Sequence, residues 1–115
     1  MNSPNNTYIN LNGDFAVTIC GDRLVNFGIQ DGDVIVIKQQ ADVLNEALAL
    51  VEYEGALMIT KIHRDFDKDV IILQSGNPKY PPIILEGEDK EWVTVIGKAI
   101  LIIRNIEECE GDNED

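Results

Sequence analysis

The sequence predicts a single, mostly β domain with little helix. Hydrophobic residues make up 44% of the 115 residues, and Val, Ile and Leu, which dominate them, arrive in short runs. A chain of this length can bury one core but not two. We therefore expect sequential hairpins in a domain over 13–105, with a flexible arm over 1–12 and an acidic disordered tail over 106–115.

The charge of the chain restricts the partners that it can bind by itself. The formal net charge is -12, and acidic residues are concentrated at 107–115. A surface this negative repels phosphate backbones, so we expect no direct DNA binding by this chain. A small acidic mimic of nucleic acid is a further hypothesis, which the charge allows but the apolar strands do not specifically support.

The sequence carries no signal for export, membrane insertion or metal binding. It has no basic and then apolar leader, and no apolar run approaches the ~20 residues that a membrane span needs. Cys20, expected in a buried strand, and Cys109 in the tail do not make a disulfide framework. One histidine and no Cys-x-x-Cys or His-x-x-x-His spacing predict no metal and no cofactor. We expect a cytoplasmic protein without a membrane contact.

Two predicted strands flank a stretch of tight turns. Phe15, Val17 and Ile19 alternate with other side chains, which indicates a strand over 14–19, and an unbroken apolar run indicates a second strand over 34–38. Glycines between them permit backbone angles that other residues resist. The glycines and acidic residues that shape this stretch are Gly21, Asp22, Gly28, Asp31, Gly32 and Asp33.

Hairpins follow in the middle of the chain. A two-residue turn at Glu54 and Gly55 joins two apolar runs, which is a hairpin pattern. A helix over 40–51 is the competing prediction for the first run, because Ala, Leu and Glu favour helix. The strands expected here lie at 47–53, 56–63 and 70–73.

A proline-rich loop and a long strand complete the domain. Three prolines and a glycine exclude regular pairing over 74–82, and the last strand is expected over 92–104. Gly97 in the middle of that strand indicates a bulge or bend. Both faces of the strand are apolar, so one face should meet the core while something else covers the other.

The turn stretch resembles the catalytic-serine segment of the LexA/UmuD family of self-cleaving repressors and mutagenesis proteins. In that family the segment reads roughly Gly-x-Ser-Met and, a few residues later, Gly-Ile-x-Asp-Gly-Asp. Residues 28–33 match the second part. In the first part, Arg23 occupies the position that matches the serine, and Leu24 the position of the methionine.

Three further motifs follow in the order that the family has. Lys61 matches the family's lysine base, and Gly97 lies in a match to its closing Ile-x-Gly-x-Val strand. Residues 73–83 resemble its Leu-x-Ser-x-Asn-Pro-x-Tyr-x-Pro-Ile loop, whose matching positions are Ser75, Asn77, Pro78 and Tyr80. The resemblance covers about residues 13–105. It implies a LexA/signal-peptidase-like β-ribbon fold with a small curved sheet.

The resemblance also implies a reaction that this chain is not equipped to perform. In the family, a serine hydroxyl activated by a neutral lysine cleaves an upstream Ala-Gly or Cys-Gly bond of the same protein. Arg23 cannot be a nucleophile because its guanidinium stays protonated. No Ala-Gly pair precedes it, and the Cys20-Gly21 pair belongs to the site's own strand and turn. We expect a pseudo-peptidase. The alternative is an active Ser/Lys peptidase with a displaced serine, Ser75 with Lys61.

What remains is association and regulation. The resemblance implies an oligomerisation and regulatory domain of a phage- or SOS-type transcriptional repressor, or a stand-alone accessory that pairs with a related repressor or a polymerase subunit. Since the family associates through its C-terminal strand region, we expect a homodimer that uses Ile96, Ile100 and Ile102; the alternative is that the chain's own first strands cover them.

The two cations of the degenerate site are expected to lie apart. Like charges ~4 Å from each other repel by about 4 kcal/mol at an effective dielectric of about 20. Arg23 should therefore point away from Lys61, with Asp22 as its counter-charge.

Overall fold

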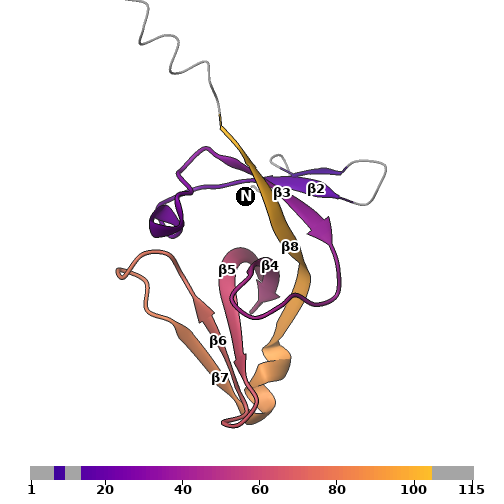
Figure 1. Cartoon of the computed structure of the whole chain (residues 1–115), viewed down its shortest axis with the longest axis vertical. Coiled ribbons are helices and arrows are strands. Elements are labelled where there is room, and N and C mark those ends of the chain that lie inside the picture. The colour runs from indigo at the N-terminus through magenta and orange to yellow at the C-terminus, as the bar shows by residue number, and fades with distance from the viewer. Residues whose placement is uncertain (1–6, 10–13, 105–115) are drawn as a thin grey trace, which may run out of the picture.

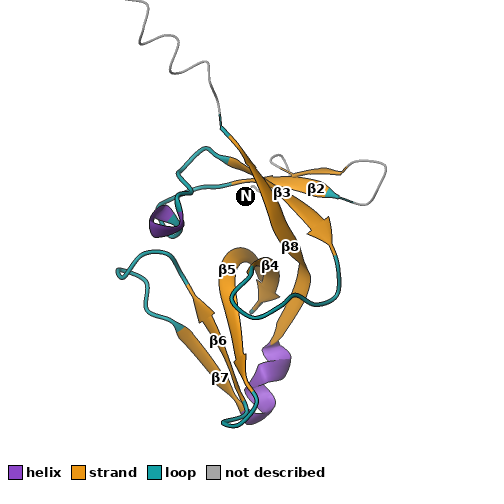
Figure 2. Cartoon of the chain, viewed as in Figure 1, coloured by secondary structure: helices purple, strands orange, loops and turns teal. Residues whose placement is uncertain are grey.

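A computed structural model describes the backbone at residues 7–9 and the whole chain over 14–104. Over these residues the fold is one curled antiparallel sheet in the order β1-β2-β3-β8-β4-β5-β6-β7 (Figures 1 and 2). Two short 3-10 helices, η2 at Val25–Phe27 and η3 at Gly87–Trp92, accompany it. The strands are β1 Thr7–Ile9, β2 Phe15–Thr18, β3 Val34–Gln39, β4 Leu48–Tyr53, β5 Ala56–Asp65, β6 Val70–Gln74, β7 Ile83–Glu86 and β8 Val93–Ile103.

The prediction of a mostly β fold is confirmed, and the competing helix over 40–51 does not form. In its place a loop leads into β4, which pairs with β5 on one side and with β8 on the other. The two neighbours hydrogen-bond both edges of β4, and Ala49, Leu50 and Val51 are buried on its two faces, so tertiary context overrides the helix propensity of Ala and Leu. At the following turn, Glu54 and Gly55 have φ angles of 54° and 81°, as a type I′ hairpin requires.

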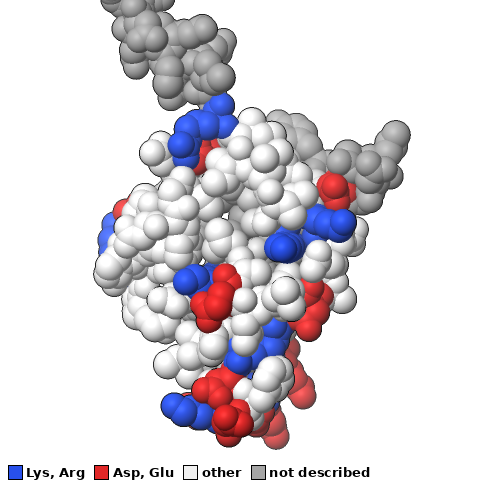
Figure 3. Space-filling view, in the orientation of Figure 1, with Lys and Arg blue, Asp and Glu red and all other residues white. Residues whose placement is uncertain are grey.

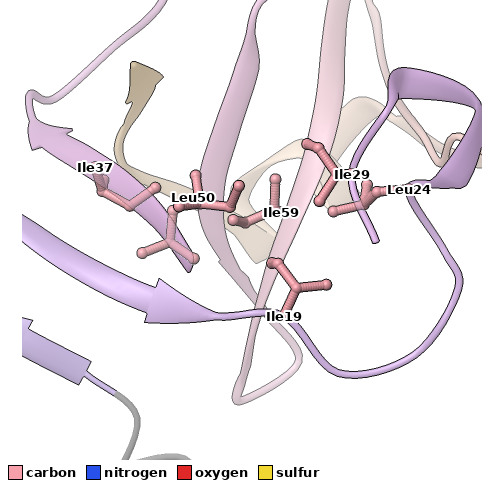
Figure 4. Packing of buried hydrophobic residues seen from close by; sticks show 7 residues of the cluster. Ile19, Leu24, Ile29, Ile37, Leu50 and Ile59 are labelled. Carbon is pink, nitrogen blue, oxygen red and sulfur yellow. The ribbon is translucent and has the colours of Figure 1, made fainter. Parts of the chain in front are cut away.

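Each face of the sheet carries its own hydrophobic cluster, because successive side chains of a strand point to opposite faces. In β4, Leu50 belongs to the first cluster, whereas Ala49 and Val51 belong to the second. The first cluster, part of which is drawn in Figure 4, comprises Ile19, Leu24, Ile29, Ile35, Ile37, Leu50 and Ile59. The second comprises Val43, Ala49, Val51, Ile62, Leu73 and Leu85.

β8 lies inside the sheet, and its two halves have different neighbours. β4 pairs with residues 93–98 of this strand, and β3 pairs with residues 97–103. The register against β4 shifts beside Gly97, where an added Cβ would lie 2.5 Å from the carbonyl oxygen of Lys38. Glycine is therefore required at this position.

Three local features differ from the expectations. The short strand β1 lies within the segment expected as an arm, and β7 lies in a segment for which no strand was expected. Cys20 is exposed and does not lie in a buried strand, because β2 ends before it at Thr18. The acidic tail over 106–115 and Cys109 lie outside the described residues.

An ion pair between the half-exposed Arg104 and a buried carboxylate ties the end of β8 to the turn that precedes β3. Asp33 is only 2% exposed, and Arg104 donates to its carboxylate from Nε at 2.9 Å and from Nη2 at 2.7 Å. The N–H of Gln30 donates to the same carboxylate at 2.8 Å, and Arg104 also donates to the carbonyl of Gly28 at 2.8 Å. The Arg104 hydrogen bonds, followed by that of Gln30, lower the pKa of Asp33 to about 2.

Replacing Arg104 by alanine should destabilise the fold in a pH-dependent manner. Arg104→Ala leaves a buried carboxylate without its cation, and we expect it to lower the free energy of unfolding at neutral pH by about 2 kcal/mol. Because pairing lowers the pKa of Asp33, this stabilisation is complete above the unfolded pKa of about 4 and is lost as the pH falls toward about 2. Urea unfolding of both proteins across this range measures the difference.

The matched control for this prediction is Lys68→Ala, which removes one positive charge from the exposed turn between β5 and β6. It should leave the pH dependence unchanged. A stability difference between Arg104→Ala and the original protein that persisted undiminished near pH ~2 would contradict the assignment.

Candidate degenerate peptidase site

Two loops that meet beside the sheet carry most of the residues selected from the sequence. The first loop, residues 19–33, joins β2 to β3, and the proline loop, residues 75–82, joins β6 to β7. They face each other in Figure 2 as the segment with η2 and the teal loop next to it. Gly76 donates its N–H to the carbonyl of Arg23 at 2.7 Å and accepts the N–H of Asn26 at 2.7 Å.

Close packing accompanies these two backbone hydrogen bonds. A Cβ added to Gly76 would lie 2.8 Å from the ring of Phe27, closer than side chains approach in folded proteins. The absence of a side chain at Gly76 therefore allows the proline loop to rest directly on the aromatic residue of the first loop.

Asp22 is the polar centre of the contact between the loops. Its carboxylate accepts the hydroxyl of Tyr80 at 2.7 Å and the ammonium of Lys79 at 3.2 Å, and its backbone carbonyl accepts the amide of Asn77 at 2.8 Å. The hydrogen bond from Tyr80, and next that from Lys79, lower the pKa of the Asp22 carboxyl. Three residues of the proline loop thus converge on one residue of the first.

The acidic and glycine residues of the first loop hold its own turns. Asp31 accepts the N–H of Gly21 at 2.7 Å, and Gly32 donates to the carbonyl of Ile19 at 2.8 Å. The φ angles of Gly21, Gly28 and Gly32 are 96°, 83° and 90°, in the left-handed region that L side chains resist. These glycines therefore have backbone roles.

Ser75 has a buried hydroxyl that is committed to its own loop. Ser75 is 8% exposed, and its Oγ lies 2.9 Å from the carbonyl oxygens of both Asn77 and Tyr80. It also accepts the N–H of Asn77 at 3.3 Å. Asn77 in turn accepts the N–H of Lys79 across Pro78. Ser75 shapes the proline loop, and its hydrogen bonds do not include Lys61.

Arg23 rests on an aromatic ring and not on a carboxylate. Its guanidinium carbon lies 4.8 Å from the ring centroid of Tyr80, and its buried Nε has no hydrogen-bond partner among the described residues. The expectation that Asp22 is its counter-charge is wrong, because the Asp22 carboxylate is engaged by Tyr80 and Lys79.

Lys61 lies in a charged environment. Its ammonium is 3.7 Å from the carboxylate of Glu46 and 5.4 Å from the ring centroid of Phe27. The other carboxylate oxygen of Glu46 lies 2.5 Å from Nδ1 of His63. The side chain of Lys61 is 30% exposed, so it is neither dry nor surrounded only by apolar groups. Arg23 and Lys61 thus have different partners.

Comparison with known proteins assigns the family. The Peptidase S24-like family matches residues 1–100. The chain belongs to this family. Similar proteins include the LexA repressors of Carboxydothermus hydrogenoformans, 37% identical over 90 residues, and of Geobacter sp. (strain M21), 32% identical over 95 residues. The matches cover 78% and 83% of this chain but only 42% and 46% of those repressors, so the chain spans less than half their length.

The resemblance to the LexA/UmuD family is therefore confirmed, but sequence reasoning missed one residue of this S24-like site. Glu46 lies in the loop before β4, and its N–H donates to the carbonyl of Ile62 at 2.8 Å. The register of the predicted hairpin could have located Glu46. A two-residue turn at 54–55 places Leu48 opposite Lys61. Residues just before Leu48 then lie beside Lys61 and His63.

The described residues show no further sites of two kinds. Over 14–104, no group of three or more His, Cys, Asp or Glu side chains is arranged to hold a metal ion. Within the same part of the chain, no helix has the length and apolar character needed to cross a membrane.

Proposed function

We propose that this chain is a non-catalytic LexA-like oligomerisation and regulatory domain. It belongs to a phage- or SOS-type transcriptional repressor, or acts alone as an accessory that pairs with a related repressor or a polymerase subunit, and it works in the cytoplasm. The supporting observation is that the two loops are fully assembled around Arg23, at the position that matches the family's serine. A guanidinium stays protonated and cannot attack a carbonyl.

Two neighbouring groups support the absence of peptidase chemistry. The hydroxyl of Ser75, the alternative nucleophile, is held by the carbonyls of Asn77 and Tyr80. The ammonium of Lys61, which matches the family's base, has the carboxylate of Glu46 beside it. A nucleophile needs a base within about 3.2 Å that can take its proton, and the described hydrogen bonds of Ser75 do not provide one.

The C-terminal half of β8 supports a homodimer. Residues 99–103 pair with β3 only, since pairing with β4 ends at Lys98, so one backbone edge of this half has no partner among the described strands. Ile100 and Ile102 are 47% and 42% exposed there. A free apolar edge is a liability that a symmetric partner strand removes.

Ile96 has a different place from the other two proposed interface residues. It packs against the first hydrophobic cluster. The dimer contact is therefore centred on the last residues of β8. Ile100 and Ile102 themselves line a groove of about 360 Å³, together with apolar residues of β3, β4, β8 and the first loop.

Self-cleavage is expected to be absent even under permissive conditions. Incubation at pH ~10, close to the ordinary lysine pKa of about 10.4, gives even a poorly tuned lysine base a substantial neutral fraction. The intact mass should nevertheless stay unchanged, and a supplied family substrate should stay uncut. Mass spectrometry follows both. Specific fragments that disappear in Ser75→Ala would contradict the proposal and establish the displaced-serine alternative.

The dimer is expected to depend on the end of β8. At ~100 μM, well above a micromolar Kd, sedimentation should give a dimer, and Ile100→Asp with Ile102→Asp should give a folded monomer. The matched control is Leu44→Asp with Ile84→Asp, which places two charges on exposed apolar residues elsewhere and should leave the dimer intact. If the original protein is a monomer at this concentration, the proposed dimer is refuted. If the Ile100→Asp with Ile102→Asp variant is folded and still dimeric, the interface lies elsewhere.

A further inference from the structure

A hollow separate from the loops described above lies where β4, β8 and the end of η3 come together. Its volume is about 450 Å³. Its lining residues are Glu52, Glu54, Gly55, Trp92 and Thr94. The indole of Trp92, the last residue of η3, is 53% exposed, which is unusual for the largest side chain of a small domain.

The geometry of the sheet places apolar and acidic groups side by side in this hollow. Glu52 pairs with Thr94 of β8 and with Leu57 of β5, so these three residues form one row across three strands. Leu57 is 53% exposed. The hollow therefore combines an indole, an aliphatic side chain at its margin and two carboxylates.

The carboxylates of the hollow have no cation. The ion pairs among the described residues involve neither Glu52 nor Glu54. Burial, and then the charges of Glu54 and Asp89 and a hydrogen bond with Glu54, raise the pKa of the Tyr53 hydroxyl. In Figure 3, acidic side chains gather together with Lys or Arg side chains at the lower end of the molecule, where η3 and the turn between β5 and β6 lie in Figure 1.

We propose that this hollow is a docking site for an arginine side chain of a basic segment in a partner protein. A guanidinium stacks on an indole face, where the ring quadrupole attracts the cation, and its fork of N–H donors reaches carboxylates on either side. Glu52 and Glu54 are placed to accept those hydrogen bonds. A basic segment complements the net charge of -12, whereas a second copy of this chain presents the same negative surface.

The protein contains a direct reporter for this contact. Trp92 is its single tryptophan, so fluorescence excited at the red edge of the indole absorption, where the three tyrosines do not absorb, reports on the hollow. The probe is the blocked peptide acetyl-Gly-Arg-Gly-Arg-Gly-amide, and its counterpart with citrulline in place of arginine has the same shape without the charge. We expect a saturable change in fluorescence with the arginine peptide and none with the citrulline peptide.

Matched variants separate the hollow from the general charge of the protein. Glu52→Gln with Glu54→Gln should weaken the apparent affinity about tenfold, since a stacked guanidinium loses both charged acceptors. The control variant, Asp67→Asn with Glu86→Gln, removes the same charge from exposed positions outside the hollow. It should change the apparent affinity for the arginine peptide less than about twofold. The proposal is overturned by no saturable change, by an equal response to citrulline, or by equal weakening in the two double variants. It does not depend on whether the domain cleaves itself.

Discussion

The hydrogen bonds around Asp22 are the constraint on which the degenerate site depends. They join two loops that are distant in sequence, and they do so with a hydroxyl, an ammonium and an amide from one proline-rich segment. Backbone hydrogen bonds between Gly76 and the first loop fix the orientation of the two loops relative to each other. Because both loops have many conformations when free, holding them together requires several simultaneous contacts. Arg23 is positioned by the same contact, through the ring of Tyr80.

This arrangement is compatible with the proposed loss of peptidase chemistry. The turns of the first loop rest on Asp31, on Asp33 and on glycines, and none of these roles requires a hydroxyl at position 23. Arg23 gains an aromatic partner and gives up nothing that the loop needs for its shape. The end of β8 is tied to this same first loop, since Arg104 donates to Asp33 and to the carbonyl of Gly28, and these contacts need no nucleophile at position 23. The proposed assembly through β8 therefore gives the scaffold a role apart from catalysis.

Local sequence patterns predicted most of the fold, but the prediction of the site was limited because the site depends on long-range contacts. Alternation and apolar runs located β2, β3, β5, β6 and β8, whereas β4 was ambiguous because Ala and Leu also favour helix, and the four residues of β7 follow two prolines. The glycine and aspartate turns were evident from their spacing. The stacking of Arg23 on Tyr80 was not, because nothing local indicates which side chain another loop brings to it. The pairing of Lys61 with Glu46 was available only from the hairpin register.

The central claim is that a guanidinium takes the place of the family's nucleophile at position 23 while the surrounding scaffold stays in place. A crystal structure of the Arg23→Ser variant tests it most directly, since the backbone of both loops is held by groups other than the Arg23 side chain. The account predicts unchanged loops and an introduced hydroxyl oxygen within about 3.2 Å of the Lys61 ammonium. Loops that separate or rearrange, or a hydroxyl more than about 5 Å from Lys61, would contradict it.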